Sequence, residues 1–311
     1  MESSYDCIVV GGGAAGLSAA LVLGRARRRT LVIDASGQSN RPAHGIGGLL
    51  GYDQRPPAEL YDQGRRELAA YPSVQVRDTS VVSGEVVDGQ FVVNLADGTS
   101  MTGRRLLLAT GVEYRYPNID GIADRWGASV FHCPFCHGWE VRDRALGVLD
   151  DGATAVMRAR LLRAWSDDVT VYTNGPAGLD GDELATLASA GVAVEERPVA
   201  GLVGAAPDLE AVRFADGTTK RCGGMLVPVT LHQRSELGAQ LGATLAPNGP
   251  LAPEAIQVDA MGQTDVRGLF AAGDSSSPMP RITGAIADGS TAAAAIVHSL
   301  IDELWPVVSS S

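Results

Sequence analysis

Two cysteines separated by two residues lie in the stretch FHCPFCHG, residues 131–138, with a histidine on each side. Thiols at this spacing can bind a metal, exchange disulfides or have no chemical role. A structural zinc site needs about four ligands, and the other two cysteines, Cys7 and Cys222, belong to no second CxxC pair. Ligands at positions 132, 133, 136 and 137 would crowd one helical turn, so we expect no metal site.

Disulfide exchange suits this pair better. Pro134 is acceptable at the first position of a helix, because its missing N–H costs nothing there. Cys133 would then sit at the start of the helix, where nearby N–H groups stabilise its thiolate. Cys136 lies one turn further on, close enough to form a disulfide with Cys133. Exchange moves protons, and histidine is the side chain best matched to neutral pH, so His137 and His132 are the candidates for proton transfer.

The elements that would position these groups begin at the N-terminus. Residues 5–10 (YDCIVV) are typical of a buried parallel strand. The turn GGGAAG follows, then an Ala/Leu-rich helix to about residue 24, then a second strand, TLVID, at 30–34. This order of strand, glycine-rich turn, helix and strand predicts a dinucleotide-binding unit.

The glycines of this turn have separate physical roles. Gly11 allows the tight turn, Gly13 lets the backbone approach a pyrophosphate, and Gly16 lets helix and strand pack closely. The start of the helix offers unpaired N–H groups to the phosphates. Asp34 ends the second strand and would accept hydrogen bonds from an adenosine ribose.

Two further stretches carry matching signals. LLLATGV, residues 106–112, is a strand that ends in Thr110-Gly111. GLFAA near the C-terminus ends in Gly273-Asp274, and an Ala-rich helix follows. An acid in this position can bind the ribityl hydroxyls of a flavin, and the start of the following helix can face the ring edge where negative charge collects on reduction.

The motifs GGGAAG, ATG, CPFC and FAAGD, in this order, make nearly the whole chain resemble the low-molecular-weight thioredoxin reductase family. The resemblance implies an α/β fold of two Rossmann-like, three-layer dinucleotide-binding domains, the second inserted in the first, and a homodimer. We expect a FAD-binding domain at 1–115 and 236–311 and an inserted NADPH-like domain carrying the CxxC pair at 116–235. The implied FAD contacts are Gly11, Gly13, Gly16, Asp34, Thr110, Gly111, Gly273 and Asp274. Asp34 departs from the Glu more usual there and is one methylene shorter.

The same resemblance implies roles around the two thiols. The similar reductases carry CxxC followed by Asp-Gly, with the Asp as acid/base, whereas this chain has His137-Gly138. His137 therefore inherits the proton-transfer role, and His132 is the second candidate. Cys136 would face the flavin and Cys133 would exchange with the substrate.

A second glycine-rich turn is altered. In the family it follows the strand ALGVL, 145–149, and reads GxGxxA or similar, but here Asp150 and Asp151 open the turn. At ~5 Å and an effective dielectric constant of ~20, each carboxylate would oppose a pyrophosphate by about 3 kcal/mol. The next strand, 168–175, ends in TNG without the cationic cluster that binds the 2'-phosphate in NADPH-using relatives. We therefore expect a degenerate site that does not bind NADPH productively.

Composition restricts the partners. A formal net charge of −11 argues against nucleic acid or an anionic membrane surface. The apolar N-terminus lacks the basic region of a signal peptide, and its glycines belong to the nucleotide motif, so we expect neither a targeting segment nor a membrane span. Four cysteines in 311 residues do not form a secreted disulfide framework. We therefore expect a cytoplasmic protein.

A flavin and a CxxC pair without NADPH need another electron route. The CPxC-His-Gly motif with a degraded nucleotide site resembles dithiol oxidases of the gliotoxin and holomycin type, which close disulfides in small sulfur-containing natural products. We expect a flavin-dependent thiol–disulfide oxidoreductase: a small dithiol substrate reduces the CxxC disulfide, and electrons pass to FAD and then to O2, giving H2O2. The alternatives are a thioredoxin-type disulfide reductase fed by NADPH or ferredoxin, and a non-catalytic flavin-binding redox sensor.

Overall fold

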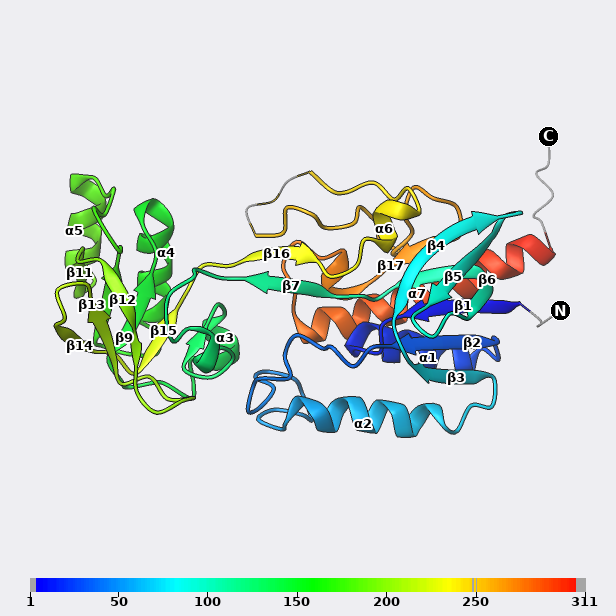
Figure 1. Cartoon of the computed structure of the whole chain (residues 1–311), viewed down its shortest axis with the longest axis horizontal. Helices are drawn as coiled ribbons and strands as arrows, with labels where there is room; N and C mark the ends of the chain where they lie inside the picture. The colour runs from blue at the N-terminus through cyan, green and yellow to red at the C-terminus, as the bar shows by residue number, and fades with distance from the viewer. Residues whose placement is uncertain (1–3, 248, 250, 306–311) are drawn as a thin grey trace. The chain divides into compact units, whose positions relative to one another are not determined.

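The fold is that of a computed structural model, which describes residues 4–247, 249 and 251–305 (Figure 1). The chain divides into two compact units. Unit 1 comprises Met1–Ser39, Ala58–Tyr114 and Thr230–Ser311, and unit 2 comprises Asn40–Pro57 and Arg115–Val229. Unit 1 contains a mixed sheet whose β1, β2, β3, β6 and β17 pairings are parallel, and unit 2 contains a parallel sheet; helices pack on both. This confirms the expected α/β fold of two Rossmann-like units.

Unit 1 is built on a seven-stranded sheet. Its strands are β1 (Tyr5–Val10), β2 (Thr30–Asp34), β3 (Val74–Asp78), β4 (Val81–Val87), β5 (Gln90–Leu95), β6 (Ser100–Leu108) and β17 (Leu269–Ala271). The order is β3-β2-β1-β6-β5-β4, and β17 pairs in parallel with the end of β6. β1 and β2 are almost continuously apolar because both faces of the parallel part are covered. The carboxyl ends of β1, β2, β6 and β17 therefore meet at one edge.

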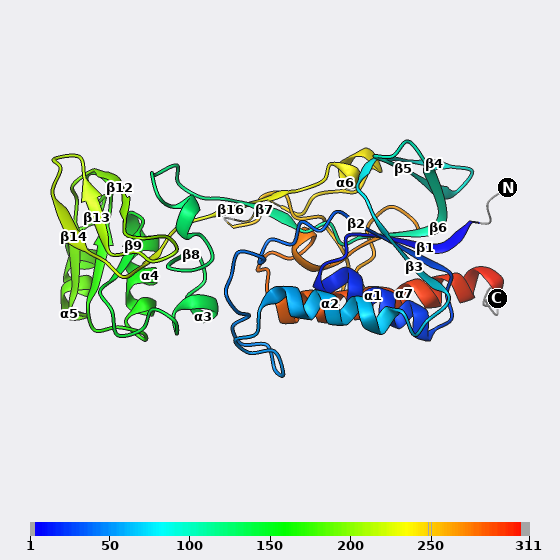
Figure 2. The same ribbon diagram turned by 60° about the horizontal axis from the view of Figure 1, so that its bottom comes forward.

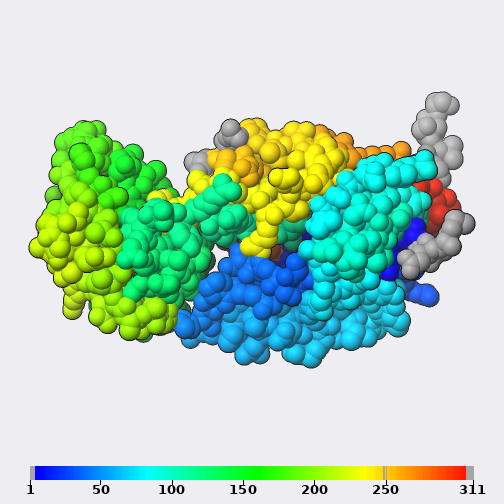
Figure 3. Space-filling view, viewed as in Figure 1, coloured from blue at the N-terminus to red at the C-terminus, as the bar shows by residue number. Residues whose placement is uncertain are grey.

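The helices of unit 1 come from both ends of the chain. They are α1 (Ala14–Arg25), α2 (Pro57–Leu68), α6 (Leu237–Gln240), the 3-10 turn η2 (Gly273–Ser275) and α7 (Ile282–Leu304). Figures 1 and 2 show α1, α2 and α7 on the same side of the sheet. In the space-filling view the cyan and yellow parts of unit 1, far apart in the chain, form one continuous surface (Figure 3).

Helix α1 packs closely on α7. A Cβ atom added at Gly289 of α7 would lie 2.1 Å from the carbonyl oxygen of Ala15, so only glycine permits this approach. The length and composition of α7 would allow it to cross a membrane. However, Ala292, Ile296 and Leu300 have no exposed surface and share one core with α1, which is the arrangement of a core helix.

Unit 2 has three layers. A parallel sheet in the order β11-β10-β9-β15-β8 lies between two helices and a three-stranded antiparallel sheet, β12-β13-β14. The bounds of the parallel strands are β8 (Val130–Phe131), β9 (Leu146–Leu149), β10 (Val169–Tyr172), β11 (Val192–Glu195) and β15 (Gly224–Leu226). The other elements are β12 (Val199–Val203), β13 (Ala211–Phe214), β14 (Thr219–Arg221), the helices α4 (Gly152–Leu162) and α5 (Gly181–Ser189), the one-turn helix α3 (Pro134–His137) and the 3-10 turn η1 (Ala123–Arg125).

Two short strands, β7 (Val112–Arg115) and β16 (Thr230–Gln233), pair with each other where the chain passes between the units. These boundaries lie close to the expected ones at residues 115 and 235. Residues 40–57 differ, since the sequence assigned them to the FAD domain at 1–115 and they group with unit 2. The reason is direct backbone contact: a Cβ at Gly47 would lie 2.6 Å from the carbonyl oxygen of Cys136.

Candidate active site

The cysteine pair occupies a one-turn helix in unit 2. Cys133 is the residue before α3, with extended backbone (φ −124°, ψ 107°), and Pro134 is the first helical residue. The two cysteines are joined in a disulfide with a Cα–Cα distance of 5.4 Å. Proline at the first position and cysteine at the third thus bring the sulfurs together without a long loop.

The other two cysteines lie elsewhere and are buried. Cys7 is in the middle of β1, where burial raises the pKa of its thiol. Burial also raises the pKa of Cys222 to about 12. A thiol that stays protonated at neutral pH is a poor nucleophile, so thiol chemistry is confined to Cys133 and Cys136.

Burial favours the neutral form of both histidines beside the disulfide. Burial, and then the charges of His137 and Arg158, lower the pKa of His132 to about 4. The ring of His132 stacks on Trp126, with centroids 5.7 Å apart. Burial lowers the pKa of His137 as well, and Glu140 opposes that shift.

His137 differs from His132 in its hydrogen bonding. Neither of its ring nitrogens has a hydrogen-bond partner within the described part of the chain, although both are buried. The backbone groups of Cys133 and Gly127 lie near enough to oppose the lowering of its pKa, but they do not meet the geometry of a hydrogen bond. An unpartnered, buried ring nitrogen is rare in folded proteins. A neutral imidazole with a free lone pair next to Cys136 is able to accept a proton.

The loop at residues 40–57 also contributes to this site. The backbone of Gly47 lies against Cys136, and Gly127 lies against the backbone of Ala43. The sequence assigned these residues to the FAD-binding domain and did not single out Gly47. The density of glycine in GIGGLLG was the available signal, since close backbone contact requires residues without a side chain.

The first glycine-rich turn has the geometry of a phosphate cradle. Gly11 has a φ of +114°, and a Cβ there would lie 2.1 Å from the carbonyl oxygen of Ala109. A Cβ at Gly16 would lie 1.8 Å from the carbonyl oxygen of Gly11. Gly13 precedes α1 and has no atom nearer than 3.8 Å to such a Cβ, so its backbone is open to a ligand. These residues fit a dinucleotide pyrophosphate.

Asp34 lies directly on this turn but is already paired. A Cβ at Gly12 would lie 2.4 Å from its carboxylate. The carboxylate accepts hydrogen bonds from the Ser36 amide (2.9 Å) and forms an ion pair with Arg65 at 2.5 Å. The expected ribose hydroxyl would therefore share this acid with a cation that the sequence motif did not reveal.

The remaining predicted flavin contacts lie at the same edge of unit 1. A Cβ at Gly11 would also contact Thr110, which follows β6, and a Cβ at Gly273 would lie 2.8 Å from Ala15. Gly111 has a φ of +68° and open space around it. Burial raises the pKa of Asp274 to about 6, opposed by Arg234 and reinforced by Asp288. The structure thus brings together all eight predicted contacts, from three distant parts of the chain, at the carboxyl ends of β1, β2, β6 and β17.

The second glycine-rich turn, between β9 and α4, carries a partly buried ion pair at its first position, while the space around Gly152 is open. Asp150 forms an ion pair with Arg158 and accepts a hydrogen bond from the Asp151 amide at 3.0 Å. Its side chain is 11% exposed. The repulsion of a pyrophosphate estimated from the sequence is therefore too large, because Arg158 offsets much of the charge on Asp150. What remains against a pyrophosphate is steric, together with the exposed carboxylate of Asp151.

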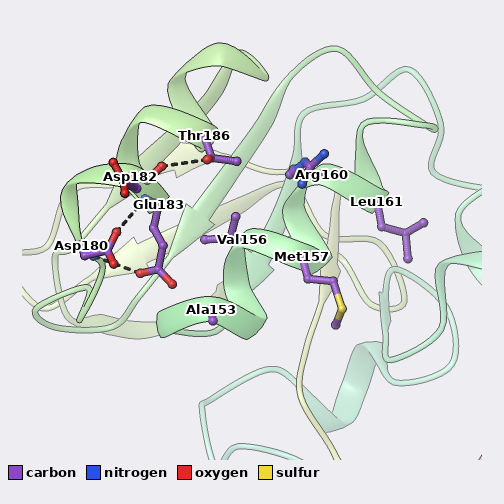
Figure 4. Close-up of a pocket in the computed structure, with 9 residues that line it drawn as sticks. All are labelled: Ala153, Val156, Met157, Arg160, Leu161, Asp180, Asp182, Glu183 and Thr186. Atoms are coloured by element: carbon purple, nitrogen blue, oxygen red, sulfur yellow. Dashed lines mark hydrogen bonds between the residues drawn. The ribbon is translucent and has the colours of Figure 1, made fainter.

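A hollow of about 660 Å³ lies between α4 and α5 (Figure 4). Its lining includes Met157 and Arg160 from α4 and Asp180 and Glu183 at the start of α5. Asp180 and Glu183 cap α5 through reciprocal hydrogen bonds, drawn as dashed lines in Figure 4. The lining contains no cysteine or histidine, so the hollow is not a redox site.

A disulfide carried on a Rossmann-like unit that is inserted in a second such unit defines a disulfide oxidoreductase of the two-dinucleotide-fold class. The chain belongs to the pyridine nucleotide-disulphide oxidoreductase family, whose model matches residues 5–289. It is thioredoxin reductase-like, as expected from its motifs, and proteins of this kind are flavoproteins.

Three relatives illustrate the similarity. The protein named thioredoxin reductase tcpT from Claviceps purpurea is 31% identical over 309 residues, covering 96% of this chain and 95% of its own. The solved structure of an oxidoreductase from Agrobacterium tumefaciens is 36% identical, with a TM-score of 0.89, covering 98% of this chain and 100% of its own. The solved structure of HlmI is 35% identical, with a TM-score of 0.89 and coverages of 97% and 94%.

Proposed function

We propose that this protein is a FAD-dependent dithiol oxidase that forms an intramolecular disulfide in a small dithiol. One observation carries the proposal. The glycine-rich turn of unit 1 begins with Gly11 and keeps all three glycines, whereas the equivalent turn of unit 2, the unit that carries the disulfide, begins with Asp150, which is paired with Arg158. The chain thus keeps one dinucleotide cradle and the reactive sulfurs, and it has altered the turn that would admit NADPH.

The substrate disulfide can form by two thiol–disulfide exchange steps at Cys133 and Cys136. A substrate thiolate attacks Cys133 Sγ, which breaks the Cys133–Cys136 bond and releases the Cys136 thiolate. The second substrate thiolate then displaces Cys133, which leaves a substrate disulfide and an enzyme dithiol. Two electrons and two protons have moved from the substrate to the cysteines. The glycine-rich turn of unit 1 would hold FAD, which would provide the acceptor for these two electrons, with O2 as the final oxidant and H2O2 as the product.

His137 supports the first step. Its neutral ring accepts the proton of the incoming thiol, because the thiolate and not the thiol is the nucleophile. Its unpartnered ring nitrogens leave the lone pair free for this purpose. His132, stacked on Trp126 and with its pKa lowered by burial to about 4, is the second candidate.

The test uses the purified holoenzyme with dithiothreitol in air. We expect O2 consumption and H2O2 release without NADPH, and loss of both in Cys133→Ser and Cys136→Ser. Under anaerobic conditions the flavin should be bleached by dithiothreitol and not by NADPH. Turnover that strictly requires NADPH would refute the proposal.

The names of the relatives favour a second candidate, a thioredoxin-type disulfide reductase. In that reaction electrons enter from NADPH or ferredoxin and leave through the cysteine pair. Rapid anaerobic bleaching of the flavin by NADPH or by reduced ferredoxin, with thioredoxin reduction, would favour it. A homodimer in the cytoplasm stays a prediction in either case, checked by light scattering and by fractionation of cells.

A further inference from the structure

Two aromatic side chains close to the disulfide are exposed to solvent. Phe135, between the two cysteines, is 72% exposed, and Trp139, just after α3, is 56% exposed. Pro134 is buried, so the turn directs its proline inward and the Phe135 ring outward. Large exposed apolar groups that lie together mark binding surfaces more often than chance.

The Phe135 ring packs against Trp165. It meets Trp165 edge to face, with centroids 5.4 Å apart and an interplanar angle of 82°. Trp165 is packed against the core of unit 2 and covers Gly138, where a Cβ would lie 2.9 Å from the indole. A ring fixed in this way loses little freedom when a ligand stacks on it.

Trp139 has one face already covered. The guanidinium of Arg142 lies 3.8 Å from the centre of its ring and donates a hydrogen bond of 2.6 Å to the Trp139 carbonyl oxygen. Asp143 lies 4.0 Å from Arg142 and offsets its charge. The exposed carboxylate of Glu140 follows Trp139 directly, so the surface disfavours an anionic ligand.

A substrate sulfur has to reach Cys133, and the exposed ring of Phe135, two residues further on, is available to contact such a substrate. A protein partner needs about 1,000 Å² or more of contact, whereas two exposed rings offer a few hundred. We propose that Phe135, held by Trp165, stacks on the planar ring of an uncharged small dithiol while its sulfurs react with Cys133. This deepens the proposed function, on which it rests, by naming the substrate class.

The experiment compares two dithiols with the same skeleton. 1,2-Bis(mercaptomethyl)benzene has a planar ring, and 1,2-bis(mercaptomethyl)cyclohexane has a puckered one. The anaerobic reduction of the Cys133–Cys136 disulfide is followed in a single turnover, with the cyclic product measured by mass spectrometry. This half-reaction needs no O2, so it remains informative if the oxidase activity itself fails.

Phe135→Leu should weaken apparent binding of the benzene dithiol about fivefold and that of the cyclohexane dithiol less than twofold. Phe135→Tyr keeps an aromatic ring and should therefore retain the wild-type preference for the benzene dithiol over the cyclohexane dithiol. Leu184→Ala, which removes an exposed apolar side chain of α5 in the same unit, is the matched control and should behave as the wild type. Matching urea midpoints exclude misfolding.

Two outcomes would overturn the stacking surface. Equal losses for both dithiols in Phe135→Leu would mean that Phe135 acts on the disulfide turn itself. No change for either dithiol would mean that the Phe135 ring does not contact the substrate. The exposed ring would then be assigned to a contact with another protein.

Discussion

At the scale of single residues, the state of His137 controls the chemistry. Burial lowers its pKa below the ordinary value of about 6.5, which favours the neutral ring at neutral pH. A base of this kind matters most where the substrate thiol, with a pKa near 8.5, is still protonated. The contribution of His137 therefore depends on pH in a predictable direction.

His137→Asn should slow disulfide exchange with dithiothreitol about 100-fold at pH 7, the usual range for a lost general base. The deficit should shrink as pH rises past about 8.5, because the substrate then ionises by itself. A pH profile of kcat/KM across the neutral and alkaline range measures this. A deficit of the same size at every pH would show that His137 only shapes the turn.

The sequence predicted the chemistry of the disulfide turn but not all of its surroundings. CPxC, the proline at the helix start and the adjacent histidine are local features, and the structure has the cysteines paired as expected. The contact of Gly47 with Cys136 and the ion pair of Arg65 with Asp34 join residues far apart in the chain. Such contacts follow from tertiary packing, which a motif does not encode.

At the scale of elements, helix positions were predictable from strand–glycine–helix patterns. The expected helix after GGGAAG is α1, and the expected strand at 145–149 is β9. The ion pair at the second glycine-rich turn was only half predictable. The aspartates were visible, but the reach of Arg158 back to Asp150 depends on the path of α4.

Helix α7 provides a matched pair of substitutions. Gly289→Ala should destabilise the protein by about 3 kcal/mol, since the new Cβ would lie 2.1 Å from backbone of α1 and overpack the contact. Gly284→Ala, on the same helix with open space around it, should stabilise by up to ~1 kcal/mol through helix propensity. Urea unfolding of both variants checks this, and equal effects would contradict the close approach of α1 and α7.

At the scale of the whole molecule, both Rossmann-like units and their order along the chain follow from the two sets of motifs. The placement of residues 40–57 with unit 2 does not. This loop has no repeating apolar pattern, and its position depends on backbone contacts at Gly47 and Gly127.

Stability should depend on pH through His132. Its pKa is about 4 in the folded chain and about 6.5 when unfolded, so between these values only the unfolded chain binds the proton. The free energy of unfolding should therefore have its full value above about pH 6.5. It should fall by about 3 kcal/mol as the pH decreases towards about 4.

His132→Phe keeps a ring against Trp126 and removes the titration. Urea unfolding of wild type and variant at neutral pH and at two acidic pH values above about 4 should give curves that diverge, with the wild type losing more. Asp274, whose pKa is raised to about 6, titrates with the opposite sign but is present in both proteins. Parallel curves would rule out a neutral His132.

The split of unit 1 along the chain has a consequence for biosynthesis. Strand β6 pairs with β17, and α1 packs on α7, whereas unit 2 is complete at Val229. During synthesis, the residues of unit 2 are all present before β17 and α7 have been made. The apolar surfaces of α1 and β6 then still lack the elements that cover them in the folded protein. During that interval they are exposed to chaperones and to aggregation, so premature termination after unit 2 yields a sulfur-bearing unit beside an unfinished partner.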